Sequence, residues 1–152
     1  MKQDRFLIGI LAGIALLVVV ALVVFFTRQP DKNYLSDDTP EAVVHNYVLA
    51  VLNEDYQKAY GYLADKPDKP TLDAFMSDIY QPANVGVNLG ETHINGDIAT
   101  VDLAVVYNPS DPFSGRYSNA ERATLVKQTD GWKLTSMPYN FWGYNWYTGQ
   151  PK

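Results

Sequence analysis

An uncharged apolar run from Phe6 to Phe26 constrains this chain more than any other feature of its sequence. A helix rises about 1.5 Å per residue, so the run matches a bilayer core of about 30 Å. It is longer than the apolar core of a signal peptide, which has about 7–15 residues. The chain also lacks the cysteine that lipoprotein processing requires. We therefore expect an uncleaved, single-pass signal anchor, a transmembrane helix over residues 6–26.

The residues around this run bear on its orientation. Lys2 and Arg5 precede it and Arg28 and Lys32 follow it, so the positive-inside rule does not decide between the two ends. A short head before a large polar domain favours a cytoplasmic N-terminus. The expected location is thus the cell membrane, with residues 1–5 in the cytoplasm, the lipid bilayer around residues 6–26, and the C-terminal domain outside the cytoplasm.

Gly9 and Gly13 stand four residues apart within the run. Such a spacing lets two membrane helices approach closely, which favours self-association or packing on a partner helix. Glycine is also simply common in membrane helices, and this second interpretation stays open.

Composition excludes several functional classes. The chain has no cysteine and only two histidines. It can therefore form no disulfide framework or thiol nucleophile, and we expect no metal site and no cofactor. Its net charge of −5 argues against nucleic-acid binding, because phosphate contacts need a basic surface.

The polar part of the chain begins with a short linker, residues 27–38, followed by three helix signals. Thr39 caps the first helix, with Pro40 in its first turn, and apolar residues at helical spacing continue it to about Asn53. Asp55 caps a second helix, and Thr71 caps a third, short one.

The hydrophobic period then changes to two, with a hairpin signal at Asn95-Gly96. A strict two-residue turn would pair Leu89 with Asp102 and put the apolar sets of the two strands on opposite faces. One additional residue pairs Leu89 with Leu103 instead. We therefore predict a three-residue loop or a bulge in this hairpin.

Two more strands are expected, at residues 117–128 and 132–137. The predicted fold class is therefore α+β. An N-terminal transmembrane helix precedes three helices packed on a curved four-stranded antiparallel sheet. The α+β domain spans residues 39–138, and its apolar sheet face should curl around the first of its helices.

Several of these segments resemble nuclear-transport-factor-two-like domains, over roughly residues 38–138. They are Asp38-Thr39-Pro40-Glu41-Ala42-Val43-Val44, Asp55 to Tyr60, Gly96-Asp97 with the alternating strand after it, and Asp130-Gly131-Trp132-Lys133-Leu134. The resemblance implies a cone-shaped domain with a pocket. That group includes ketosteroid isomerases and SnoaL-like polyketide cyclases as well as non-catalytic members, so it does not fix function. Single-helix anchors carrying such domains resemble accessory subunits of type IV secretion systems and of mycobacterial lipid importers.

Four residues are candidates for lining that pocket: Tyr47, Leu103, Tyr107 and Trp132. A tyrosine hydroxyl there could donate a hydrogen bond to a ligand, although a buried tyrosine with a satisfied hydroxyl is the alternative. No catalytic residue is assigned, because no acid, base and nucleophile stand at a recognisable spacing. Asp102 is expected to point away from the apolar face.

The C-terminal tail, residues 139–152, is unusually aromatic. Three interpretations stay open: it closes the cone, it docks a partner protein, or it binds a glycan or a membrane interface. The partner-binding candidates are Tyr139, Phe141, Trp142, Tyr144, Trp146 and Tyr147.

The sequence therefore predicts a membrane-anchored, extracytoplasmic and non-catalytic interaction module. It would be an accessory subunit that assembles with other membrane or envelope proteins. The alternative is a small apolar-ligand binder, or an isomerase or cyclase that uses the cone pocket.

Overall fold

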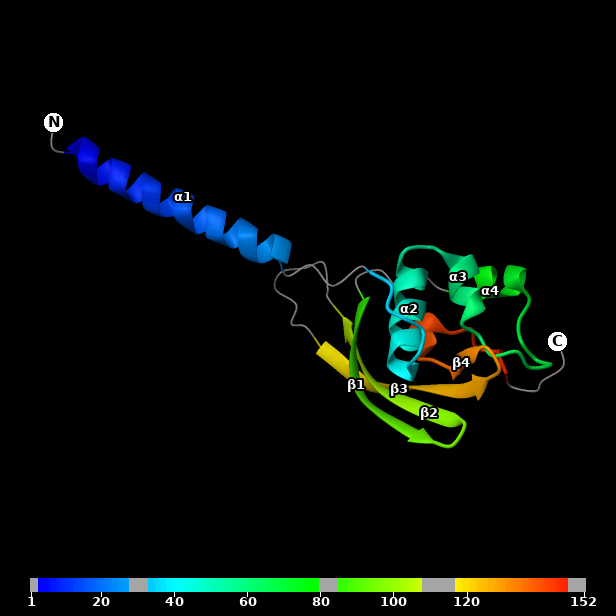
Figure 1. The fold of residues 1–152 in the computed structure, drawn as a ribbon. Helices are drawn as coiled ribbons and strands as arrows, with labels where there is room; N and C mark the ends of the chain where they lie inside the picture. The colour runs from blue at the N-terminus through cyan, green and yellow to red at the C-terminus, as the bar shows by residue number, and fades with distance from the viewer. Residues whose placement is uncertain (1–2, 28–32, 80–84, 108–116, 148–152) are drawn as a thin grey trace. The chain divides into compact units, whose positions relative to one another are not determined.

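The computed structural model describes residues 3–27, 33–79, 85–107 and 117–147, with the side chains of the first helix described over residues 7–23. The chain divides into two compact units, Met1–Asn33 and Tyr34–Lys152. The first unit contains α1 (Gln3–Thr27). The second contains α2 (Pro40–Leu52), α3 (Tyr56–Gly61), α4 (Leu72–Asp78), β1 (Val85–Asn95), β2 (Ile98–Tyr107), β3 (Tyr117–Gln128), β4 (Gly131–Ser136) and the short 3-10 helix η1 (Tyr139–Phe141) (Figure 1).

The first unit corrects the prediction made from the apolar run. Across the described residues, no helix combines the length and the apolar character that a bilayer crossing needs. Three predictions are therefore wrong: a transmembrane helix over residues 6–26, a signal anchor, and a single-pass location in the cell membrane.

Gly9 and Gly13 lie within α1, and no described atom outside the helix comes within 4 Å of where their Cβ atoms would be. The packing of a second helix on these two glycines stays a prediction.

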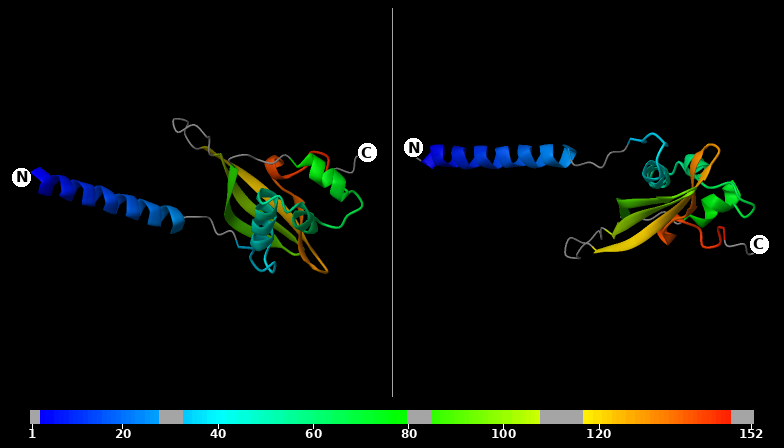
Figure 2. Two further views of the ribbon diagram at one scale, coloured as in Figure 1. Left: turned by 90° about the horizontal axis from the view of Figure 1, so that it is seen from above. Right: turned by 60° about the horizontal axis from the view of Figure 1, so that its bottom comes forward.

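The second unit confirms the rest of the fold class. Its four strands form one antiparallel sheet in the order β1-β2-β3-β4, a simple meander. Helices α2, α3 and α4 precede the sheet in the chain, so the domain is α+β as expected. In Figures 1 and 2, α2 lies across one face of the sheet.

The three predicted helix caps are also confirmed. The side chains of Thr39, Asp55 and Thr71 accept hydrogen bonds from the backbone N–H groups of Ala42, Lys58 and Ala74. Each cap satisfies a backbone donor that the first turn of a helix leaves unpaired.

The hairpin between β1 and β2 has the predicted register. Leu89 pairs with Leu103, and a bulge follows before Thr92 pairs with Val101. The turn has two residues, Gly96 and Asp97, one position later than the signal at Asn95-Gly96 indicated, and the extra residue of β1 in the bulge brings Leu89 opposite Leu103. Gly90 suits the bulge because a Cβ there would stand 3.2 Å from the carbonyl oxygen of Asp102. The apolar residues of both strands consequently share the face that packs against α2.

Residues 34–38 dock on α2 through a buried amide. The Oδ1 atom of Asn46 accepts a hydrogen bond from the backbone N–H of Leu35 at 2.8 Å, and its Nδ2 donates to the carbonyl oxygen of Leu35 at 2.8 Å. Nδ2 also donates to Asp37, whose Oδ1 accepts from the hydroxyl of Tyr62 at 3.3 Å. The side-chain amide of Asn46 thus makes the same two hydrogen bonds to the backbone of Leu35 that the backbone of a neighbouring strand would make.

The contact between Tyr62 and Asp37 leads to a prediction about the stability of the domain at alkaline pH. Burial, and then the charge of Asp37, raise the pKa of Tyr62 from 10.0 to about 12. The folded state holds the proton more firmly than the unfolded state, so the stabilisation is complete below pH 10 and is lost between about pH 10 and 12. We expect the unfolding free energy to fall less steeply across this window in Tyr62→Phe than in the unmodified chain, as measured by urea denaturation. Equal slopes for the two chains would contradict the assignment.

Candidate functional site

The aromatic tail, residues 139–147, is divided between the core and the surface. Phe141 and Trp146 are buried, and Trp142 and Tyr147 are half-buried. In contrast, Tyr139 is 76% exposed and Tyr144 is 94% exposed. The tail follows β4 through Met137 and Pro138, which are both buried. Figures 1 and 2 show it, in orange to red, beside the helical layer of the domain.

Trp146 fixes the far end of the tail against α4. Its indole stacks on the ring of Phe75 with 4.9 Å between the ring centroids and 21° between the ring planes. The indole Nε1–H donates a hydrogen bond to Oδ2 of Asp78 at 3.1 Å. The apolar ring is thereby buried while its one polar group is satisfied, which is the arrangement a buried tryptophan requires.

Tyr47 on α2 holds the near end of the tail. Its hydroxyl donates a hydrogen bond to the carbonyl oxygen of Phe141 at 2.6 Å. Burial raises the pKa of Tyr47 well above its ordinary value, so this hydroxyl stays protonated and remains a donor. The ring of Trp142 meets the ring of Tyr47 edge-on at 6.2 Å. The pocket candidate Tyr47 therefore binds the protein's own tail.

Tyr147 makes the last described contact of the tail. Its hydroxyl donates a hydrogen bond to the carbonyl oxygen of Ala64, and its ring stacks on Trp142 with centroids 5.8 Å apart. Burial raises the pKa of Tyr147 as well, which keeps the donor protonated. Its backbone has a positive φ of 56°, a conformation uncommon for a residue with a side chain.

Gly143 makes this packing possible. A Cβ built at Gly143 would lie 2.2 Å from both Cε2 and Nε1 of Trp146. No pair of non-bonded atoms tolerates that distance, so any other residue would force the indole or the backbone to move. The tail needs glycine here for room.

The described hydrogen bonds from the tail to the rest of the domain run through side chains. They involve the hydroxyls of Tyr47, Tyr107 and Tyr147 and the indole of Trp146. By contrast, the backbone bonds of the tail join its own residues, as from the N–H of Trp146 to the carbonyl of Gly143 at 3.3 Å. The tail is therefore attached to the domain without being an added strand of the sheet.

The other pocket candidates lie in or beside the core. Leu103 and Trp132 are buried among apolar side chains. Tyr107 is half-buried; its hydroxyl donates to Oδ1 of Asn140 at 2.9 Å, and its ring stacks on Tyr117 at 4.6 Å. Of the four candidates, Tyr47 and Tyr107 thus bond directly to the tail.

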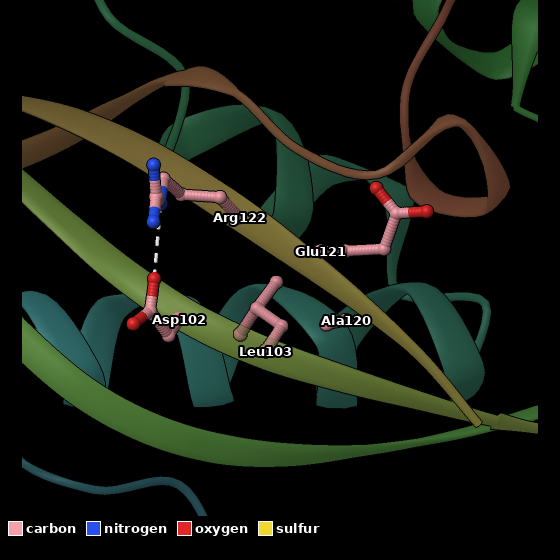
Figure 3. A pocket seen from close by; sticks show the side chains of 5 residues that line it. All are labelled: Asp102, Leu103, Ala120, Glu121 and Arg122. Carbon is pink, nitrogen blue, oxygen red and sulfur yellow. Dashed lines mark hydrogen bonds and ion pairs between the residues drawn. The ribbon is translucent and has the colours of Figure 1, made fainter.

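A hollow of about 430 Å³ is lined by Asp102, Leu103, Ala120, Glu121 and Arg122 (Figure 3). Nε of Arg122 donates to Oδ1 of Asp102 at 2.9 Å, and Nε2 of His93 lies 3.9 Å from Oδ2 of the same carboxylate. Asp102 pairs with Arg122 across the strands, on the opposite face from Leu103, as the alternation predicted. An exposed ion pair of this kind contributes at most about 1 kcal/mol.

Sequence reasoning missed three residues of these sites. Arg122 was missed because its position opposite Asp102 depends on the register between β2 and β3, which no turn signal in the sequence determined. The helical pattern placed Phe75 on the inward face of the third helix but did not reveal its contact with Trp146. Asp78 was not singled out, because the sequence separation of 68 residues between Asp78 and Trp146 hides their contact. Among the residues that the structure describes, no three histidine, aspartate or glutamate side chains gather as metal ligands would.

Comparison with known proteins found similarity in fold only. No protein-family profile matches the sequence, and no curated protein matches it. A solved structure of a putative calcium/calmodulin-dependent protein kinase type II association domain from Thiobacillus denitrificans is similar. It has 12% identity and a TM-score of 0.51, over 66% of this chain and 92% of that one.

A SEC-C motif containing protein from Rhodopseudomonas palustris has 15% identity and a TM-score of 0.49, over 67% of this chain and 79% of that one. Neither likeness bears on activity. The resemblance to nuclear-transport-factor-two-like domains stays a prediction.

Proposed function

We propose that residues 34–147 form a non-catalytic interaction module that assembles with a partner protein through the exposed residues of its aromatic tail. One observation carries this proposal: Tyr139 and Tyr144 are exposed on a segment that Phe141 and Trp146 anchor in the core. Rigidly supported tyrosines lose little conformational freedom on binding and are frequent energetic hot spots of interfaces.

The same contacts weigh against the alternative of a ligand-binding or isomerase-type cone. A pocket of that kind needs polar groups that are aimed at a ligand and free to bind it. The hydroxyl of Tyr47 instead donates to Phe141, and that of Tyr107 donates to Asn140. Leu103 and Trp132 pack within the apolar core. The two hydroxyl groups that were expected to meet a ligand are thus bonded to the protein's own tail.

A pair of variants tests the proposal. Tyr139→Ser with Tyr144→Ser removes both exposed rings, and Tyr117→Ser removes a ring that is 57% exposed on β3. The full chain and both variants would be captured from the source cells after chemical crosslinking. Because Tyr139 and Tyr144 are exposed, we expect the unfolding free energy of the tail variant to lie within about 0.5 kcal/mol of that of the unmodified chain. Tyr117→Ser also removes the ring stack on Tyr107, so we expect it to lose about 0.5–1.5 kcal/mol.

We expect the tail variant to lose at least about tenfold of its captured partner, equivalent to 1.4 kcal/mol, and the β3 variant to keep it. Equal capture by the tail variant and the unmodified chain would overturn the proposal. Equal loss in the tail and β3 variants would also overturn it, because the interaction would then not depend on the tail.

A further inference from the structure

The end of the aromatic tail is joined to the domain in a way that makes it separable. We call residues 142–147 the strap, and Ala64, Phe75 and Asp78 the strap-binding face. The described contacts between the two are a ring stack, an indole hydrogen bond and a hydroxyl hydrogen bond. Withdrawal of the strap would break these contacts and leave the described strand pairing of the sheet unchanged, while Phe141 would stay in the core.

The contacts define what the strap-binding face recognises. Phe75 offers a flat ring to an aromatic side chain, and the carboxylate of Asp78 accepts a hydrogen bond from that side chain's N–H at 3.1 Å. The carbonyl of Ala64 accepts from the hydroxyl of the residue that follows, Tyr147. Tryptophan is the side chain that combines a large ring with one N–H donor. The residue three positions before it must be glycine, because Trp146 occupies the space of any Cβ at Gly143.

We propose that the strap-binding face is a peptide-binding site and that the strap is its built-in competitor. Its ligands are peptides with the pattern Gly-x-x-Trp-Tyr, and the occupant seated on it, residues 143–147, is the direct evidence for that chemistry. This inference rests on the proposed function as an interaction module, but it uses a different surface from Tyr139 and Tyr144. A tethered strap acts at an effective concentration of about 1 mM, so an external peptide binds only when the strap is weakened or outcompeted.

The test uses the full chain and a fluorescently labelled synthetic peptide of residues 142–147. Trp146→Ala weakens the strap and leaves the strap-binding face intact. We expect saturable 1:1 binding of the peptide to this variant, and binding at least about tenfold weaker to the unmodified chain, as measured by fluorescence anisotropy. A peptide carrying alanine in place of Trp146 is the control and should bind at least about tenfold more weakly. Adding Asp78→Ala to the variant should weaken peptide binding because it removes the indole acceptor.

A second strap variant guards against loss of folding. Gly143→Ala displaces the strap by steric contact and leaves every residue of the strap-binding face in place. If Trp146→Ala does not fold by circular dichroism, the same titrations are made on Gly143→Ala. A folded strap variant that fails to bind the peptide at about 1 mM overturns the proposal, and so does equal binding of the two peptides. Tyr144 lies within the strap and the peptide, but it is 94% exposed, and the described contacts to the strap-binding face come from Trp146 and Tyr147. Failure here therefore leaves the capture experiment standing, and failure of capture leaves the peptide site standing.

Discussion

Replacing Gly143 with alanine is expected to lower the free energy of unfolding of the domain by about 3 kcal/mol, a large effect for the addition of one methyl group. The new Cβ would overlap the indole of Trp146 at 2.2 Å from two of its atoms. Trp146 packs between Gly143 and Phe75, so its indole has no free space to shift into on either of these two sides. The indole must leave its place, and the domain then loses both the ring stack on Phe75 and the hydrogen bond to Asp78.

Gly61→Ala is the matched control for this prediction. Gly61 ends α3, and a Cβ there would meet no described atom within 4 Å. Alanine is the better helix former, so Gly61→Ala is expected to be neutral or to stabilise by up to about 1 kcal/mol. Urea denaturation followed by circular dichroism measures both variants, and tryptophan fluorescence reports the displaced indole. A Gly143→Ala domain as stable as the Gly61→Ala domain would show that the tail does not pack as described.

Local signals predicted much of this fold because each one acts within a few residues. Thr39, Asp55 and Thr71 cap helices, and a cap needs only the next turn of chain. The bulge in the first hairpin followed from alternation alone, since Leu89 and Leu103 had to share one face. An amphipathic pattern states which side of an element is buried, and in β2 the alternation correctly placed Val101, Leu103 and Val105 on the buried side.

The packing of the tail could not be predicted in this way, because its apolar residues follow neither the helical period nor the strand period. Six aromatic residues within nine positions left three interpretations open, and their spacing did not indicate that Trp146 is buried while Tyr144 is exposed. The partners that make this choice, Phe75 and Asp78, belong to a helix far away in the sequence. The apolar run at residues 6–26 shows a different limit. Its hydropathy predicted a transmembrane helix, but among the described residues no helix is both long enough and apolar enough for a crossing.

Phe141→Ala is expected to have the largest effect on the domain, a loss of about 3–5 kcal/mol of unfolding free energy. The side chain of Phe141 is fully buried, and its backbone carbonyl accepts the hydrogen bond from Tyr47. Truncation leaves a cavity at the point where the tail enters the core, next to a tyrosine hydroxyl that must keep its acceptor. Alanine keeps the backbone carbonyl that accepts this bond, so the expected loss comes from the apolar side chain and the cavity that it leaves.

Tyr144→Ala is the control, because it removes a ring of similar size from the same segment at an exposed position. Its expected change is within about 0.5 kcal/mol. Chemical denaturation of both variants under the same conditions measures the difference between them. A difference of several kcal/mol would show that the near end of the tail is part of the core, so that only the strap beyond Phe141 can separate from the domain. If the two variants were equally stable, the whole tail would be dispensable for folding, and the buried position of Phe141 would have no energetic consequence.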